Sequence, residues 1–184
     1  PALGAIEAPG LDDVDAVVNL YASSPWCRWT PRVRDELRVT RATGTLTIVS
    51  ALDPDGRCQR FLNLSSTAFY GERGAEVLSA DAPRGVGFFA EVVATWEASA
   101  RHAPVPTALL RTPRVLGGAG GYLTLRRQLR GRLGSGLQYV PWVHVDDWTS
   151  AVAMLVRSPA EGPVNLTAPE PEITKSARPT YLPH

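Results

Sequence analysis

Residues 62–71 read Leu62-Asn63-Leu64-Ser65-Ser66-Thr67-Ala68-Phe69-Tyr70-Gly71. The apolar residues at the start of this stretch predict a buried strand, and a cluster of hydroxyl side chains follows where the strand ends. In an open α/β sheet, ligands bind outside the carboxyl ends of the strands. The stretch therefore indicates where the chemistry takes place. The alternative is a strand followed by an ordinary Ser/Gly turn.

Strand and helix patterns alternate on both sides of this stretch. Strands are predicted at 15–20, 61–64, 105–110, 137–145 and 163–166. A first helix starts at Thr30-Pro31, with Thr as its N-cap and Pro at its first position. The alternation predicts an α/β fold with a parallel sheet and crossover helices.

Each predicted helix has one apolar face. The residues of these faces are Val33, Leu37, Thr40 and Gly44 in the first helix; Phe89, Val92, Val93, Trp96 and Ala100 in the second; and Trp148, Ala151, Val152, Leu155 and Val156 in the third. Residues three and four apart lie on one side of a helix, so these faces are expected to cover the sheet. Asp146 is the predicted cap of the third helix.

The composition excludes some classes of protein. The 184 residues carry a net charge of +1, which argues against a dedicated nucleic-acid or membrane-surface protein. No apolar run is long enough for a membrane span, and the first residues lack a signal-peptide pattern. Lys175 is the sole lysine, a bias typical of a GC-rich bacterial genome. Cys27 and Cys58 have no metal or redox spacing, which favours free thiols in a reducing, cytoplasmic compartment.

The chain resembles the epimerase-like branch of the extended or atypical short-chain dehydrogenases/reductases, the NAD-dependent epimerase/dehydratase (sugar-nucleotide epimerase-like) family. The resemblance runs in order over about residues 11–171 and rests on short strings: 15–20, Arg28-Trp29-Thr30, Ser65-Ser66 to Tyr70-Gly71, Phe89 to Val92 with Trp96-Glu97, Leu110-Arg111-Thr112 with 115–117, 134–138, 142–147, 162–166 and 168–171.

The resemblance implies a Rossmann-like doubly wound parallel sheet in three αβα layers, incomplete at the N-terminus. Residues 1–168 form its NAD(P)-binding core, and 169–184 are an irregular tail that starts a substrate region. The family's first βαβ unit carries a Gly-rich turn for the pyrophosphate, and no such turn precedes Asp15. The chain also does not begin with Met, so we expect a fragment or a processed product.

The resemblance places catalytic hydroxyls at the end of the strand in 61–64. Ser66 matches the residue that binds the substrate hydroxyl or carbonyl, with Thr67 as the alternative. The superfamily's proton-donating Tyr and its Lys are replaced by Phe89 and Val93. Tyr70 is a candidate substitute acid, or else a half-buried anchor for a loop.

The resemblance also implies the residues that line the cofactor. These are Asn19, Leu20, Tyr21 and Ala22 after one strand, Leu64 and Ser65 at the end of the next, and Thr112, Pro113 and Arg114 after a third. NADP is slightly favoured over NAD. Tyr21 replaces a small family residue and is expected to crowd the nicotinamide or ribose pocket.

Two polar clusters are interpreted as structural. His144, Asp146 and Asp147 do not match a closed metal site, and capping by Asp146 is favoured over acid–base work. The arginines of the 126–132 segment (Arg126, Arg127, Arg130 and Arg132) are interpreted as a solvated helix face, with binding of a phosphorylated substrate as the alternative.

Three functions remain open from the sequence. The first is an NAD(P)-dependent oxidoreductase or epimerase acting on a small, sugar-nucleotide-like hydroxyl or carbonyl substrate, with homodimerisation allowed. The second is a non-catalytic dinucleotide- or ligand-binding scaffold, and the third is a cofactor-independent enzyme in the same cleft. Replacement of the Tyr-Lys pair favours the last two.

Overall fold

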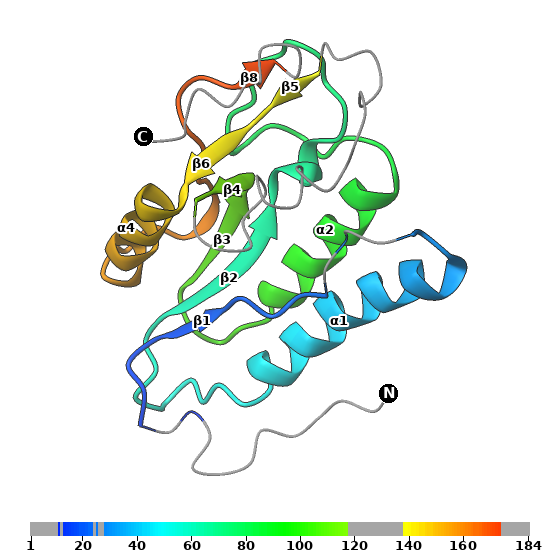
Figure 1. Cartoon of the computed structure of the whole chain (residues 1–184). Helices are drawn as coiled ribbons and strands as arrows, with labels where there is room; N and C mark the ends of the chain where they lie inside the picture. Colours follow the sequence, from blue (N-terminus) through cyan, green and yellow to red (C-terminus); the bar gives the residue numbers. More distant parts are fainter. Residues whose placement is uncertain (1–10, 12, 24, 26–27, 118–137, 174–184) are drawn as a thin grey trace.

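The computed structural model of the chain describes residues 11, 13–23, 25, 28–117 and 138–173. Its main sheet holds four parallel strands in the order β1-β2-β3-β7. These are β1 (Val17–Asn19), β2 (Phe61–Ser66), β3 (Thr107–Thr112) and β7 (Gly162–Asn165). The predicted parallel sheet is confirmed, with β3 starting two residues later than expected and β2 running through the first two serines (Figure 1).

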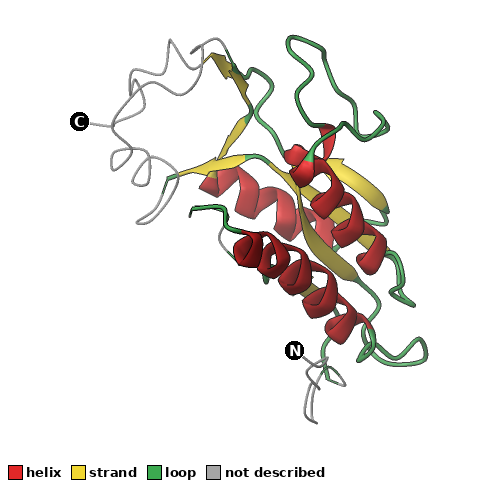
Figure 2. Cartoon of the chain, turned by 90° about the vertical axis from the view of Figure 1, so that its right-hand side faces the viewer, coloured by secondary structure: helices red, strands yellow, loops and turns green. Residues whose placement is uncertain are grey.

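In the described part of the chain, three α-helices accompany the sheet: α1 (Pro31–Val49), α2 (Phe88–Ala100) and α4 (Val145–Val156). A short 3-10 helix, η1 (Thr67–Tyr70), follows β2 directly. The predicted start of α1 is confirmed, because Thr30 Oγ1 accepts a hydrogen bond from the backbone N–H of Val33. Helices α1 and α2 lie side by side along one face of the sheet (Figure 2).

Two small sheets stand beyond the carboxyl ends of the main strands. β4 (Arg114–Leu116) pairs in parallel with β6 (Trp142–His144), and β5 (Tyr139–Val140) pairs antiparallel with β8 (Glu172–Ile173). The single strand predicted at 137–145 is therefore divided at Pro141 and ends before Val145, where α4 begins. The predicted irregular tail contains β8 at its start.

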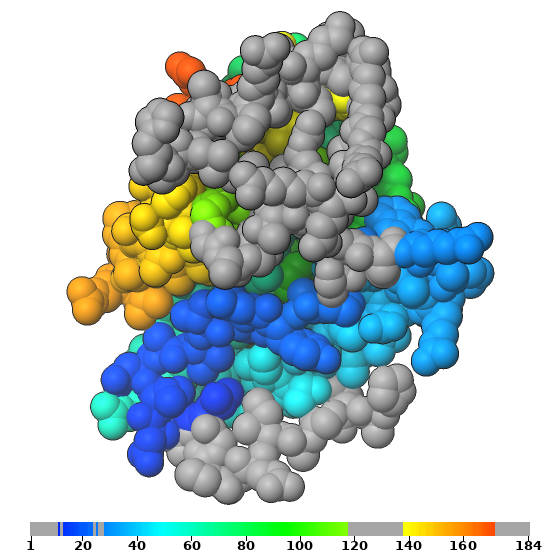
Figure 3. Space-filling view, viewed as in Figure 1, coloured from blue at the N-terminus to red at the C-terminus, as the bar shows by residue number. Residues whose placement is uncertain are grey.

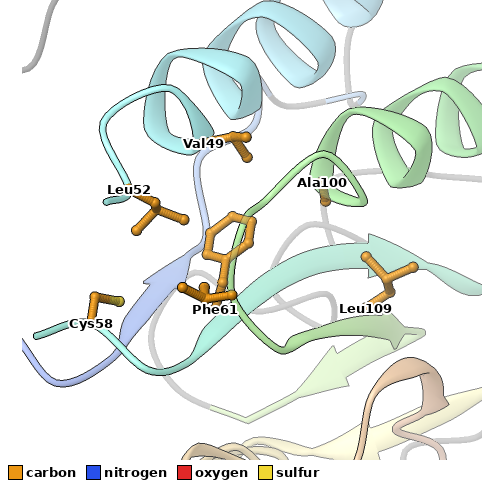
Figure 4. Packing of buried hydrophobic residues seen from close by; sticks show 7 residues of the cluster. Val49, Leu52, Cys58, Phe61, Ala100 and Leu109 are labelled. Carbon is orange, nitrogen blue, oxygen red and sulfur yellow. The ribbon is translucent and has the colours of Figure 1, made fainter. Parts of the chain in front are cut away.

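Residues that alternate along the strands form one core on each face of the sheet. Phe61 and Leu109 face α1 and α2, where they pack with Val49 and Ala100 (Figure 4). Leu62, Ala108 and Leu110 face α4 and pack with Leu155. Successive side chains of a strand point to opposite faces, so the two cores show the three-layer αβα arrangement expected of a Rossmann-like fold.

The buried face of α1 differs from the predicted one. Its buried residues are Leu37, Arg41, Thr45 and Val49, whereas Thr40 and Gly44 are only partly buried. Arg41 is buried because its guanidinium donates to the carbonyls of Leu37 and Ser23. The apolar pattern of α1 is weak, and buried polar residues took the place of the expected apolar ones.

β1 forms an edge of the described sheet. Its neighbour on one side is β2, and Val18 keeps 37% of its surface exposed. The blue segment around β1 lies at the surface in Figure 3. Among the described strands, β1 therefore has one free edge, whose backbone groups have no neighbouring strand.

No described helix combines the length and the apolar character needed to cross a bilayer. Cys58 is a free, buried thiol that packs in the Phe61 core, whereas Cys27 lies outside the described residues.

Replacing Leu109 with alanine should lower the free energy of unfolding by about 3 kcal/mol, because the deletion loses apolar burial and leaves a cavity. Denaturant unfolding followed by tryptophan fluorescence measures the change. Met154→Ala is the control, since Met154 is 64% exposed on α4, and it should change stability by less than about 0.5 kcal/mol. Equal losses in the two variants would contradict the central place of Leu109.

Candidate functional site

The hydroxyls after β2 are separated by the alternation of the strand. Asn63 and Ser65 point to the α1/α2 face, and Ser66 follows on the opposite side. Ser66 lies beside Thr112 in the register of β2 and β3. Two sets of polar side chains therefore meet at the carboxyl edge of the sheet, one under α2 and one toward α4.

A buried ion pair organises the set under α2. Arg111 Nε and Nη2 donate to Glu97 Oε1 and Oε2 at 2.8 and 2.9 Å, and both side chains are 2% exposed. Ser65 Oγ donates to Glu97 Oε1 at 2.6 Å. The guanidinium also lies 3.6 Å from the centre of the Phe69 ring. Such a two-pronged pair is the strongest geometry for an arginine and a carboxylate.

Tyr70 extends this network to β7. Arg111 Nη1 donates to the Tyr70 hydroxyl at 2.8 Å, and that hydroxyl donates to Asn165 Oδ1 at 2.5 Å. Tyr70 is only 4% exposed. Because its hydroxyl both donates and accepts inside the protein, these contacts favour the anchoring interpretation of Tyr70 over its use as an acid.

The charge of Arg111 is stabilised by its partners. Burial lowers the pKa of the Arg111 guanidinium, but its hydrogen bonds to Glu97 and Tyr70 outweigh burial and leave that pKa above its ordinary value. Arg111 therefore stays charged under all ordinary conditions, and the site contains a fixed cation matched by a fixed carboxylate partner.

A second buried network fixes the end of β1. Asn19 Nδ2 donates to Asn63 Oδ1 at 2.7 Å and to Thr45 Oγ1 at 3.2 Å, and Asn19 Oδ1 accepts the backbone N–H of Tyr21. The Trp96 indole N–H donates to the same Thr45 oxygen. Both polar atoms of the Asn19 side chain are thus hydrogen-bonded inside the protein. Through its bond to the Tyr21 N–H, Asn19 fixes the start of the loop that follows β1.

Leu20 and Tyr21 then leave the sheet at its surface, where they are 49% and 59% exposed. A Cβ on Gly44 would lie 2.8 Å from Cδ1 of Tyr21, so the tyrosine ring rests against α1 at a position where a side chain would displace it. Ala22 is partly buried. The ring of Tyr21 packs along α1, and this packing holds it to one side of the β1 end.

Ser66 and Thr67 differ from the other hydroxyls of this edge. Ser66 Oγ accepts the backbone N–H of Ala68 and caps η1, but in the described structure its own O–H has no acceptor. The Thr67 hydroxyl likewise makes no hydrogen bond among the described residues. By contrast, Ser65 and Tyr70 both donate internally. Ser66, the last residue of β2, and Thr67, the residue that follows it, thus each retain a hydrogen to offer a ligand.

The segment after β3 is held by α4. Thr112 Oγ1 donates to the carbonyl of Leu110 and accepts the indole N–H of Trp148 at 3.0 Å. Pro113 and Arg114 follow and are partly buried. Leu64, the remaining residue expected to line the cofactor, is also partly buried. A ligand at this edge meets the backbone of this segment more readily than its side chains.

Phe89 and Val93, which the resemblance aligns with the superfamily's Tyr and Lys, both take part in packing. Phe89 makes an edge contact with Trp29, with 4.7 Å between ring centres. Val93 is 1% exposed in the core. Neither side chain can transfer a proton.

The cap of α4 is His144, which corrects the assignment to Asp146. His144 Nδ1 accepts the backbone N–H of Asp146 at 3.3 Å, and Asp146 lies in the first turn of the helix. Among the described residues, no three His, Cys, Asp or Glu side chains are placed to bind a metal ion. The arginines of the 126–132 segment lie outside the described residues.

Sequence reasoning missed the residues that connect the site. Arg111, Glu97 and Asn165 lie in the strings that carry the family resemblance, but the sequence predicts no role for them. A signal was present, because Arg111 lies inside an apolar strand and Glu97 on the apolar face of a helix, and charges in such positions need each other.

A sequence model of the NAD dependent epimerase/dehydratase family matches residues 5–167. The epimerase family protein Mb2239 of Mycobacterium bovis is 36% identical over 181 residues, an alignment that covers 93% of this chain and 60% of that protein. The chain thus spans less than two thirds of the length of this relative.

Two solved structures share the fold of this chain and have more than 25% sequence identity to it. The human epimerase family protein SDR39U1 (isoform 2), crystallised with NADPH, has a TM-score of 0.81 and 26% identity, covering 91% of this chain and 61% of that one. A nucleoside-diphosphate sugar epimerase from Corynebacterium glutamicum has a TM-score of 0.75 and 30% identity, covering 89% and 36%. The Rossmann-like fold is confirmed by these similarities.

Replacing Glu97 with glutamine should lower the free energy of unfolding by about 3–5 kcal/mol, because the change leaves the Arg111 charge buried without its counter-ion. Denaturant unfolding near neutral pH measures this loss. Asp35→Asn is the matched control, since it breaks an exposed ion pair with Arg38 on α1 that is worth at most about 1 kcal/mol. Similar losses in both variants would show that the buried pair is not a major contributor to stability.

Proposed function

The chain belongs to the NAD dependent epimerase/dehydratase family, and we propose that it acts as an NAD(P)-dependent oxidoreductase or epimerase on a hydroxyl or carbonyl group of a small molecule. The observation that carries this proposal is the pair of unused O–H groups on Ser66 and Thr67, at the carboxyl edge of the parallel sheet. Ligands of such sheets bind at this edge.

The described residues fit the nicotinamide end of the cofactor. Leu20 and Tyr21 expose apolar surface where β1 ends, beside the strand β2 that carries Ser66, and the ring of Tyr21 rests against α1. An apolar wall with a few polar groups is typical of a cofactor site. Backbone groups of Thr112, Pro113 and Arg114 complete the edge. When bound, the nicotinamide would supply the hydride chemistry. No Gly-rich turn that would hold the pyrophosphate lies among the described residues.

Ser66 is assigned as the donor to the substrate oxygen. Its oxygen is held by the Ala68 N–H, and its own hydrogen has no acceptor among the described residues, so it is available to a ligand. Such an O–H stabilises negative charge that develops on a carbonyl oxygen. Thr67 is the second donor. Tyr70 keeps the anchoring role that its contacts with Arg111 and Asn165 support.

Several finer assignments belong to the same proposal. NADP is favoured over NAD, since the human relative was crystallised with NADPH. A sugar-nucleotide-like substrate agrees with the name of the Corynebacterium relative. We propose that the protein is cytoplasmic, in agreement with the free thiol of Cys58. A homodimer without nucleic-acid partners is part of the same proposal.

The competing function is a ligand-binding scaffold without catalysis. Phe89 and Val93 favour it, because the usual proton donor and its lysine are absent from positions that now serve packing. The two functions differ in turnover and not in nucleotide binding, so each needs its own measurement.

Nucleotide binding is expected to be visible as a retained adduct in native mass spectrometry of the purified protein, with NADPH retained at lower concentration than NADH. Retention is expected because apolar surface lies beside hydrogen-bond donors at the ends of β1 and β2, and the preference for NADPH rests on the human relative crystallised with it. ADP-ribose, which lacks the nicotinamide, is the control ligand and should bind more weakly. Failure to retain either nucleotide would contradict the proposed cofactor.

Ser66→Ala should reduce kcat about 100-fold on whichever sugar nucleotide or small ketone of a substrate panel is turned over, because one donor to the developing oxyanion is lost. The dissociation constant of NADPH should stay unchanged. Ser66→Thr is the matched control, since it keeps the hydroxyl and should keep most of the turnover. Equal turnover in wild type and Ser66→Ala would remove Ser66 from the site.

A further inference from the structure

Ser66 and Thr67 are flanked in the chain by residues that contact the buried ion pair of Arg111 and Glu97. On one side, Ser65 Oγ donates to Glu97 at 2.6 Å. On the other side, Arg111 lies against the Phe69 ring and donates to the Tyr70 hydroxyl. Ser66 and Thr67 lie between these fixed points in the chain. Any shift of the ion pair therefore moves the backbone that directs both hydroxyls.

A loop of residues 71–85 leaves η1 and returns to the same place. The backbone N–H of Gly85 donates to the carbonyl of Phe69 at 3.0 Å. A Cβ on Gly85 would lie 1.9 Å from the Tyr70 carbonyl oxygen, so this closure requires glycine. A loop of this length with adjoining ends is an Ω-loop, and such loops are often functional. In Figure 1 it rises beyond the carboxyl ends of the main strands.

Arg111 and Asn165 also form hydrogen bonds with the middle of the 71–85 loop. Arg111 Nη1 donates to the carbonyl of Ala80 at 2.8 Å, and Asn165 Nδ2 donates to the carbonyl of Leu78 at 3.1 Å. Asn165 in turn accepts the Tyr70 hydroxyl. The ion pair, η1 and the loop are thus joined through hydrogen bonds to buried or partly buried groups.

We propose that Arg111 is a positioning residue: it sets the direction of the Ser66 and Thr67 hydroxyls and docks the 71–85 loop beside them as the substrate-side wall of the site. The catalytic part of this inference rests on the proposed function. The docking part stands on the contacts to Ala80 and Leu78 alone.

The chemistry of the side chain explains why arginine is required here. Its planar group offers five N–H donors, and Arg111 directs them to Glu97, Tyr70 and Ala80 at once while its face covers Phe69. Lysine carries the same charge with a point-like head and no flat face, so it cannot hold all these partners. A residue needed only for core stability would not have to reach the loop.

Trypsin cleavage after Arg84 tests the docking directly. Arg84 is exposed, but the next residue, Gly85, is buried against Tyr70, so cleavage requires the loop to leave its docked position. Arg111→Lys should accelerate this cleavage about tenfold or more relative to global unfolding measured in the same buffer. Asn165→Ala, which releases Leu78 and leaves the ion pair intact, should accelerate it in the same direction.

The matched control is Glu72→Gln. Glu72 is exposed in the same loop, and its carboxylate makes no hydrogen bond or ion pair among the described residues. Its cleavage rate after Arg84 should equal that of wild type. Wild-type protection in both Arg111→Lys and Asn165→Ala would overturn the proposal, whatever the catalytic activity of the protein.

Kinetics test the positioning of the hydroxyls. In Arg111→Lys, kcat should fall about 100-fold, because a small misplacement of a donor is costly, while the dissociation constant of NADPH stays unchanged. A released loop with unaltered kcat and KM would overturn the positioning role. A released loop in a protein whose wild type turns over no substrate would support docking by Arg111 and defeat the proposed function instead.

Discussion

The structure depends on one buried ion pair, Arg111 with Glu97. A charge without a partner in this place would cost several kcal/mol, so the two residues must meet, and their meeting fixes strand β3 against helix α2. The pairing with Glu97 leaves Nη1 of Arg111 free for further partners. This nitrogen donates to the Tyr70 hydroxyl and to the carbonyl of Ala80 in the loop. The ion pair that the burial of Arg111 requires therefore also holds residues at the carboxyl edge of the sheet in place.

The alternation of β2 separates this device from the groups that face a ligand. Ser65 points to α2 and is bonded to Glu97, whereas Ser66 points the other way and keeps its hydrogen. Neighbouring residues of the same chemical type therefore have different roles, and the period of two in a strand decides which role each one has. The apolar half of the same α1/α2 face, around Phe61, supplies stability without interfering with the polar half.

The sequence predicted the order of strands and helices well, because apolar runs and the Thr30-Pro31 start depend on local chemistry. From the hydroxyls at the end of β2 it also predicts a place for the site, and this place stays a prediction. It did not predict which hydroxyls are free, since that depends on partners distant in the chain, such as Asn165 for Tyr70. The buried face of α1 was misjudged for the same reason, because Arg41 is buried through a carbonyl of a loop that the helix pattern does not contain.

The resemblance aligns Phe89 and Val93 with the Tyr and Lys of the superfamily, and this difference limits the chemistry that can be proposed. Phe89 and Val93 are engaged in packing, so the proposed site would offer hydrogen bonds from Ser66 and Thr67 in place of a strong proton donor. A hydrogen bond polarises a carbonyl but does not by itself deliver a proton to an alkoxide. Chemistry at this edge must therefore suit a substrate whose oxygen is only polarised, or whose own groups or water supply the proton. In such a site the direction of each hydroxyl matters more than its acidity, and direction is what the network of Arg111 controls.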